Sequence, residues 1–206
     1  MTHYILDTNL LFNMGASMGL GENTKDVVSN LHTALKKAES DQIFASVPPS
    51  IVQEIASFFD NPQDPIILDF LDVVRVESPQ TAKLTLPASV VGALIEDHRE
   101  RSYRGMKVAE EELVNAATQC MGKETLPHKE FQIFSGKTIS KMRERFRTAT
   151  RTGTIDSVAD FDLIMLAHSL DGYVVSTDEG VIKWARQMGT KELSSVSFGK
   201  KMQEYL

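Results

Sequence analysis

"GTIDSVADFDLIMLAHSLDGYVVSTDEG" (residues 153–180) sets a group of acidic residues beside an apolar segment. It holds five aspartates and one glutamate but no lysine or arginine, and its middle has the pattern of an apolar helix that runs into an apolar strand. Like charges that lie close together raise the free energy of the folded state unless a cation neutralises them. The stretch therefore predicts a buried helix and strand with acids at their ends that need a cation.

Short runs of apolar, β-branched or aromatic residues predict strands elsewhere in the chain. Five such runs are found, at residues 3–6, 42–47, 72–77, 173–176 and 194–198. Most of them are separated by segments of helical period, one of which follows Asn23 and Thr24 while another opens at Pro48 and Pro49. This alternation predicts an α/β fold, a parallel sheet of about five strands flanked by helices on both faces.

The alternation stops between residues 78 and 153, where no run has the pattern of a strand. Residues 90–121 are rich in helix formers and predict either one helix or two helices separated by a break at Gly105. Pro127 precedes a further helix. We expect residues 87–127 to protrude as an inserted helical hairpin. Such a hairpin has little to bury its apolar faces against, so it is expected to pair with another copy of the chain. An ordinary helical cap folded onto the sheet is the alternative.

The overall composition excludes several classes of protein. A single cysteine, Cys120, excludes an intramolecular disulfide framework. No apolar stretch approaches the roughly 20 residues that span a bilayer, so we expect no membrane partner and a cytoplasmic location. The net charge of −6 and the pI near 5.4 argue against a dedicated nucleic-acid binder.

The distribution of charge reverses that impression. Residues 137–151 hold six basic residues and one glutamate, whereas residues 152–179 hold six acidic residues and no lysine or arginine. A basic block beside an acidic one suggests a polyanion held by the first and metal ions held by the second. A solvated helix face beside an acidic surface is the alternative.

The acidic residues fall where a binding crevice is expected. Asp7 directly follows the first predicted strand, and Asp178 follows the strand at residues 173–176. The carboxyl ends of parallel strands line the crevice of an open sheet. Asp156 and Asp160 are four residues apart at the start of a predicted helix, on one face of it. A helix N-cap is the structural alternative for Asp7, Asp156 or Asp178 taken singly.

Two further residues near this set are weaker candidates. Asp162 is turned by about 200° from Asp160 around the helix axis. His168 lies in the middle of the same predicted helix, where a structural role is expected. Clustered carboxylates without Cys or His ligands select hard divalent ions, so the expected cofactor is Mg²⁺ or Mn²⁺ and not zinc.

The predicted helix that follows Pro127 has a basic and an apolar face. Its apolar stripe consists of Ile139, Met142, Phe146 and Ala149. Arg143, Arg147 and Arg151 recur at every fourth position and form a row suited to a phosphate backbone. Lys137 and Lys141 are further candidates for RNA contacts. Such a row would recognise the shape of an A-form helix more than its base sequence.

Four motifs resemble the pattern of PIN-domain nucleases. They are "ILDTN" (residues 5–9), "SIVQEI" (50–55), "DFDLIMLAHSL" (160–170) and "VVSTDEG" (174–180). On that pattern Asp7, Asp160 and Asp178 are metal ligands, and Glu54 matches the common second acid of the family. A surface glutamate on a helix is the alternative for Glu54.

Within that superfamily, nearly the whole chain resembles the HARP family of protein-only ribonuclease P, whose members are also called RNA ligase partner proteins. The resemblance rests on the inserted helices, on "SYRGMKVAEEEL" (102–113), on "KTISKMRERFRTATR" (137–151) and on the cluster of Asp156, Asp160 and Asp162. It implies metal-dependent removal of the 5′ leader from precursor tRNA and assembly of dimers into a larger homo-oligomer. Asp7, Asp156, Asp160 and Asp178 match the acidic centre of that family, and Arg143 and Arg147 fall on its RNA-facing helix.

The resemblance also divides the chain into three parts. Residues 1–80 are the N-terminal part of the PIN domain, residues 81–135 are the helical insertion used for oligomerisation, and residues 136–206 are the C-terminal part with the basic helix and the acidic centre. Two other functions stay open. One is a toxin-type PIN ribonuclease, although that group has shorter chains, and the other is a non-catalytic RNA-binding partner subunit.

Overall fold

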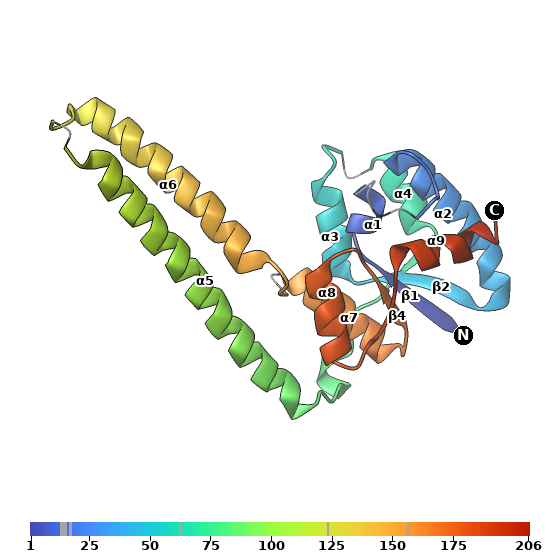
Figure 1. Ribbon diagram of the computed structural model, residues 1–206. Helices are drawn as coiled ribbons and strands as arrows, with labels where there is room; N and C mark the ends of the chain where they lie inside the picture. The colour runs from blue at the N-terminus through green and yellow to red at the C-terminus, as the bar shows by residue number, and fades with distance from the viewer. Residues whose placement is uncertain (13–15, 17, 62, 123, 156) are drawn as a thin grey trace. The chain divides into compact units, whose positions relative to one another are not determined.

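The computed structural model describes residues 1–12, 16, 18–61, 63–122, 124–155 and 157–206 (Figure 1). Two compact units divide the chain. The sheet unit comprises Met1–Pro87 and Gly153–Leu206, and the helical unit comprises Ala88–Thr152. No helix within the described ranges is both long and apolar enough to cross a membrane.

A five-stranded parallel sheet forms the centre of the sheet unit. Its strands are β1 (Thr2–Leu6), β2 (Ile43–Val47), β3 (Val74–Val76), β4 (Tyr173–Val175) and β5 (Lys191–Leu193), in the order β3-β2-β1-β4-β5. The chain thus builds β1, β2 and β3 outward to one side and then returns to place β4 on the other side of β1. The predicted α/β class with a parallel sheet is confirmed.

Helices cover both faces of this sheet. Those of the sheet unit are α1 (Asn9–Phe12), α2 (Thr24–Ala38), α3 (Pro49–Ser57), α4 (Pro65–Leu71), α7 (Val158–Ser169), α8 (Glu179–Gln187) and α9 (Ser195–Gln203), with short 3₁₀ turns at Glu39–Asp41 and Thr81–Lys83. Helix α2 contacts α4 and α9, whereas α7 contacts α3 and α8, so the helices form two layers (Figure 1).

Burial of the central strand on both faces explains its sequence. Tyr4, Ile5 and Leu6 are all buried, and the Tyr4 ring lies 5.2 Å from the ring of Phe198 on α9. Helix α7 is buried at five consecutive positions, residues 163–167, because it packs on the sheet and between α3 and α8. The continuous apolar runs of β1 and α7 are therefore those of a parallel sheet covered on both sides.

One predicted strand is wrong. Residues 194–198 do not form a strand, because Ser194 caps the N-terminus of α9 by accepting a hydrogen bond from the backbone N–H of Ser197 at 3.1 Å. The last strand is instead β5, which lies just before this cap. Serine favours helix N-caps because its hydroxyl satisfies a free N–H group. The alternation of serine with apolar residues had the period of a strand.

The helical unit consists of two long helices, α5 (Ala88–Cys120) and α6 (His128–Arg151), which pack against each other in antiparallel directions (Figure 1). The helix does not break at Gly105, since α5 is continuous through this residue. A Cβ atom at this position would lie 2.5 Å from Cε2 of Phe146, so glycine allows the two helices to approach closely. Residues 136–151, which the sequence motifs group with the C-terminal part of the PIN domain, belong to α6 and cluster with α5.

Candidate active site

Strand pairing places Asp7 at the switch point of the sheet, where β2 and β3 lie on one side of β1 and β4 and β5 on the other. Ile5 pairs with Val174 and Leu6 with Val175, and the N–H group of Asp7 donates to the carbonyl of Val175 at 3.1 Å. Asp7 therefore directly follows β1, and Ser176 directly follows the neighbouring β4. Ligands of open α/β sheets bind at this switch point, outside the carboxyl ends of the strands.

The carboxylate of Asp7 is buried and held by hydrogen bonds. Its side chain belongs to a residue that is only 4% exposed, and Ser176 donates its hydroxyl to Oδ2. The backbone N–H and the side-chain amide of Asn9 contribute longer bonds of 3.4 Å. Ser176 also accepts the N–H of Asp178 at 2.9 Å, so one hydroxyl links the ends of β1 and β4. Sequence reasoning missed Ser176, whose only signal is its position between the strand and Asp178.

Burial raises the pKa of Asp7 above the ordinary value of an aspartate, mainly by desolvating the carboxylate. The hydrogen bonds from Ser176 and Asn9 act in the opposite direction, whereas the negative charges of Glu54 and Asp178 raise the pKa further. Because the folded state binds this proton more tightly than the unfolded state, the charged Asp7 opposes folding at neutral pH. This destabilisation disappears as the pH falls below the ordinary carboxyl pKa.

Glu54 and Asp178, whose charges act on Asp7, are both exposed. Glu54, on α3, accepts a hydrogen bond of 2.9 Å from the hydroxyl of Thr8. Asp178 is the N-cap of α8, since its Oδ1 accepts from the N–H groups of Gly180 and Val181 at 2.6 and 3.1 Å. The capping role considered from the sequence is therefore present at Asp178, and it fixes the carboxylate at the carboxyl edge of the sheet.

Gly180 allows a neighbouring segment to reach the same edge. A Cβ atom at this position would lie 2.5 Å from the carbonyl oxygen of Thr154, so only glycine accommodates the buried Thr154 backbone. Lys183 donates to the carbonyl of Gly153 at 3.2 Å. These contacts bring the segment that leads into α7 against the start of α8.

The remaining acids of the predicted cluster are placed unequally. Asp160 is half-buried in the first turn of α7, where its N–H donates to the N-cap hydroxyl of Ser157 at 3.0 Å. Asp162 accepts a hydrogen bond of 2.8 Å from Ser50 at the start of α3. Asp156 lies outside the described residues. The structure thus ties Asp162 to the packing of α7 on α3.

His168 contacts a hydroxyl group, not an acid. Its Nδ1 lies 3.3 Å from the hydroxyl oxygen of Thr190, and the residue is half-buried. This contact agrees with the structural role expected for it.

A hard divalent ion binds several oxygen ligands that lie close together. Within the described ranges, no three or more Asp, Glu, His or Cys side chains form a group that could hold a metal ion. Among the described residues, the negative charges of Glu54 and Asp178 do act on the carboxylate of Asp7. Oxygen ligands of this kind suit Mg²⁺, which is held by one or two carboxylates together with water and substrate phosphates. The chemical type of these donors, carboxylate oxygens, is therefore the one that such an ion prefers.

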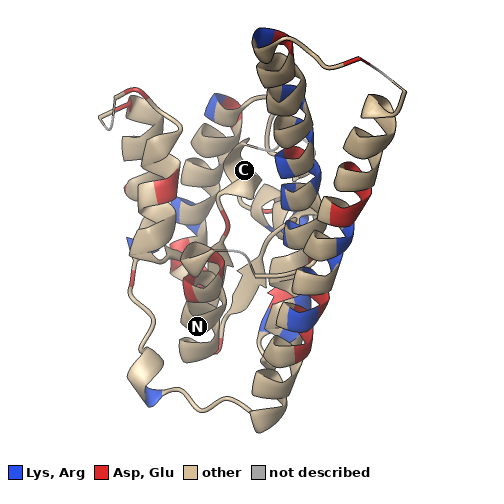
Figure 2. Cartoon of the chain, turned by 90° about the vertical axis from the view of Figure 1, so that its left-hand side faces the viewer, with Lys and Arg blue, Asp and Glu red and all other residues tan. Residues whose placement is uncertain are grey.

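The basic residues of α6 divide between two faces. Arg145 pairs with Glu112 at 2.5 Å and with Glu111 at 2.7 Å, and Lys141 pairs with Glu112 at 3.2 Å. Glu112 is only 2% exposed, and its hydrogen bond with Arg145 is the main cause that lowers its pKa. These pairs join α6 to α5, where acids and bases face each other (Figure 2).

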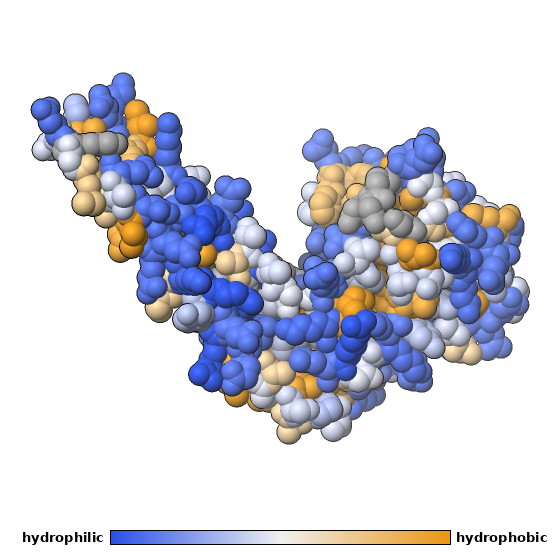
Figure 3. Space-filling view, viewed as in Figure 1, coloured by the Kyte–Doolittle hydropathy of each residue, from blue (hydrophilic) through white to orange (hydrophobic). Residues whose placement is uncertain are grey.

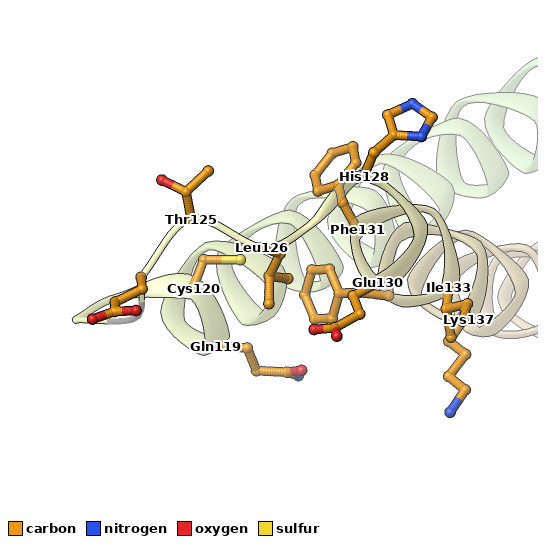
Figure 4. A pocket seen from close by; sticks show the side chains of 11 residues that line it. Gln119, Cys120, Thr125, Leu126, His128, Glu130, Phe131, Ile133 and Lys137 are labelled. Atoms are coloured by element: carbon orange, nitrogen blue, oxygen red, sulfur yellow. The ribbon is translucent and has the colours of Figure 1, made fainter.

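The arginine row lies on a different side of α6. Arg143 is two positions from both Lys141 and Arg145, which turns it by about 200° from them. Arg143, Arg147 and Arg151 are all exposed. Lys137 is also exposed, and it lines a pocket of about 780 Å³ near the connection between α5 and α6, together with Cys120, Leu126, Phe131 and Phe134 (Figure 4). The five basic residues predicted for RNA binding thus occupy three different surroundings.

The sequence was then compared with known proteins. Residues 3–206 match the model of the PINc domain ribonucleases. The chain belongs to this family. It is 32% identical over 208 residues to the RNA-free ribonuclease P of Pyrococcus abyssi, an alignment that covers 99% of this chain and 93% of that relative.

Two further relatives with the same description support a closer assignment within the PINc ribonucleases. The RNA-free ribonuclease P of Methanopyrus kandleri is 31% identical over 213 residues, which cover 98% of this chain and 93% of that protein. That of Nitrosococcus oceani is 31% identical over 191 residues, which cover 93% of this chain and 89% of that protein. The chain is a member of the RNA-free ribonuclease P group, as its sequence motifs indicate.

The hydroxyl of Ser176 gives a first prediction for this PINc ribonuclease. In Ser176→Ala the buried Asp7 loses its main donor, so its pKa rises further. We expect the free energy of unfolding at pH 7 to fall by about 1–3 kcal/mol. The loss shrinks as the pH is lowered toward the ordinary carboxyl pKa, because a protonated Asp7 needs no stabilisation of charge. Chemical denaturation at pH 7 and pH 4.5 measures both effects.

Ser102→Ala serves as the control, because Ser102 is exposed on α5 and its hydroxyl donates to a carbonyl of its own helix. It should change stability little at either pH. A loss in Ser176→Ala that is the same at both pH values would contradict the role assigned to Ser176.

Proposed function

We propose that this chain is a metal-dependent endoribonuclease that removes the 5′ leader from precursor tRNA by hydrolysis of a phosphodiester bond. The observation that carries the proposal is the position of Asp7 at the switch point of a PIN-type sheet. The pKa of Asp7 is raised by burial and by the charges of Glu54 and Asp178. The names of the relatives as RNA-free ribonuclease P support the choice of substrate. A cytoplasmic location, where precursor tRNA would be met, is part of the proposal.

The acidic side chains are proposed to hold Mg²⁺ or Mn²⁺. The ligands would be Asp7, Asp156, Asp160 and Asp178, with Glu54 beside them, while the bond from Ser50 keeps Asp162 on the packing side of α7. When bound, such ions activate a water molecule and stabilise the leaving oxygen of an in-line displacement. The residues of the chain orient these ligands: Ser176 and Asn9 fix Asp7, Thr8 fixes Glu54, and the start of α8 fixes Asp178.

The exposed arginine row of α6 is proposed to hold the phosphate backbone of the RNA. Arg143 and Arg147 are the main candidates, with Arg151 on the same face. Lys141 is a weaker candidate than the sequence predicts, because its ammonium group pairs with Glu112 at 3.2 Å. Arg145 has the same limitation, since both of its acidic partners lie on α5.

Cleavage of a precursor tRNA tests the function directly. The purified protein with Mg²⁺ should release the leader at the mature 5′ end, and EDTA should abolish the reaction. Asp7→Asn or Asp178→Asn should lower the rate at least about a hundredfold, since even indirect supports of a metal contribute 10- to 100-fold. Asp171→Asn is the matched control: Asp171 lies in the same acidic stretch but pairs with Lys191 at 2.7 Å.

The outcome also separates the alternatives. Cleavage of mature tRNA or mRNA without leader removal would identify a toxin-type ribonuclease. RNA binding that survives EDTA, with no hydrolysis in any divalent ion, would identify a non-catalytic partner subunit. Full activity of Asp7→Asn would refute the acidic centre.

The salt dependence of RNA binding tests the arginine row. Replacing Arg143 and Arg147 by alanine should flatten the slope of log K against log salt by about 0.7–0.9 for each phosphate that is no longer neutralised. Lys141→Ala should change the slope less. Arg186→Ala is the control, because Arg186 pairs with Glu192 at 2.9 Å on the sheet unit. An unchanged slope in the double variant would remove α6 from the RNA-binding surface.

Assembly into a homo-oligomer through the helical insertion is part of the proposal. Many large apolar side chains of the helical unit are exposed: Val91, Leu94, Ile95, Tyr103, Met106, Leu113, Val114, Phe131, Ile133, Ile139 and Phe146. Large exposed apolar surfaces are typical of sites that contact another protein. Light scattering should give a multiple of 22.9 kDa. Leu113→Glu should lower the mass while Leu68→Glu, on the sheet unit, should not. A monomer at micromolar concentration would contradict the proposal.

A further inference from the structure

Two stacked phenylalanines lie next to the acidic centre and have no part in the proposed reaction. Phe12 ends α1 and Phe58 directly follows α3, with ring centroids 4.7 Å apart and an interplanar angle of 28°. A third ring, that of Phe59, meets Phe12 edge-on at 5.8 Å. Offset stacked pairs of this kind are favourable and hold both rings in a defined plane.

The positions of these rings along the chain place them close to the acidic centre. Thr8 and Phe12 are four residues apart, and so are Glu54 and Phe58. The hydrogen bond between Thr8 and Glu54 and the stack between Phe12 and Phe58 are therefore successive links between the same two segments. One helical turn, about 5.4 Å, separates links at this spacing. Phe58 thus lies about one turn beyond Glu54, and Glu54 is close enough to raise the pKa of Asp7.

The exposure of Phe58 is unusual for its residue type. Phe58 is 59% exposed, whereas its neighbours Phe12 and Phe59 are half-buried. Phenylalanine is one of the residues most often buried. Hydrophobic surface is visible at the upper end of α3 (Figure 3). The half-buried rings fix the orientation of Phe58 and leave much of its own ring open to solvent.

We propose that Phe58, supported by Phe12, stacks against an unpaired base of the 5′ leader beside the scissile phosphate. The inference rests on the proposed function, which puts the end of a paired stem and the start of a single-stranded leader at the acidic centre. Bases inside an A-form stem are stacked and paired, so only the leader offers a free base face. Aromatic rings bind such faces without regard to base identity. This subsite therefore distinguishes a leader from no leader, not one sequence from another.

The test compares one precursor tRNA with its normal leader and the same RNA with abasic leader nucleotides next to the cleavage site. Under single-turnover conditions, with enzyme in excess over substrate but below saturation, Phe58→Ala should cleave the normal substrate about 5- to 150-fold more slowly than wild type, as expected for the loss of one stacked base. On the abasic substrate the two proteins should cleave at the same rate. Phe58→Trp should retain the preference for the normal leader.

Leu68→Ala is the matched control, because Leu68 is another exposed apolar residue of the sheet unit and lies on α4. It should cleave both substrates like wild type. A second measurement needs no cleavage: a 2-aminopurine placed in the leader should lose fluorescence on binding to wild type in EDTA, and this loss should be absent with Phe58→Ala.

Each result decides between the inference and the function on which it rests. Equal slowing of Phe58→Ala on both substrates, or no slowing on either, overturns the stacking subsite while leader removal by wild type stands. Slowing accompanied by a change of mass in light scattering assigns Phe58 to a contact between copies of the chain and also overturns it. A wild-type protein that cleaves neither substrate overturns both proposals.

Discussion

The carboxylate of Asp7 is buried at the carboxyl end of the central strand, and the neighbouring residues of the site are arranged around it. Strand order distinguishes this position, because β2 and β3 are added on one side of β1 and β4 and β5 on the other. Asp7 is buried, so its charge depends on local stabilisation. The hydroxyl of Ser176, the cap at Asp178 and the bond between Thr8 and Glu54 all serve this one site.

In the helical unit, acidic residues of α5 pair with basic residues of α6. A helix with many basic residues on every face would repel itself and would have no defined register against its partner. Glu111 and Glu112 hold Arg145 and Lys141 against α5, which fixes the rotation of α6 about its axis. The row of Arg143 and Arg147 is then turned to another side. Part of the basic charge of α6 therefore maintains the structure, whereas Arg143 and Arg147 are exposed on another side of the helix.

The sequence was sufficient for the features that follow from periodicity and chain order. The apolar runs of β1 and β4, the Pro-Pro start of α3 and the buried length of α7 were all predicted, because each depends on neighbours along the chain. The position of Asp7 and Asp178 at one edge also follows, since parallel strands share their carboxyl edge. The serines at residues 194–197 misled the strand prediction because alternation with apolar residues is also compatible with a capped helix.

Contacts between distant segments could not be predicted in this way. The bond from Ser176 to Asp7 spans 169 positions in the chain, and that from Thr8 to Glu54 spans 46. No periodicity encodes such a pair. Gly105 shows the same limit, because its role depends on where Phe146 lies on the other helix. The ion pairs of Lys141 and Arg145 likewise depend on the register of α6 against α5, which the arginine spacing alone does not contain.

The choice of donors around Asp7 indicates how binding and folding are related in this site. A lysine or arginine beside Asp7 would lower its pKa and stabilise the fold, but a metal ion would then have to displace that cation. Hydroxyl and amide donors orient the carboxylate without neutralising it, and the nearby Glu54 and Asp178 add to the unfavourable charge. The folded protein therefore carries an electrostatic cost at neutral pH. A divalent ion bound at the proposed site would remove this cost, and part of its binding energy would then also be folding energy.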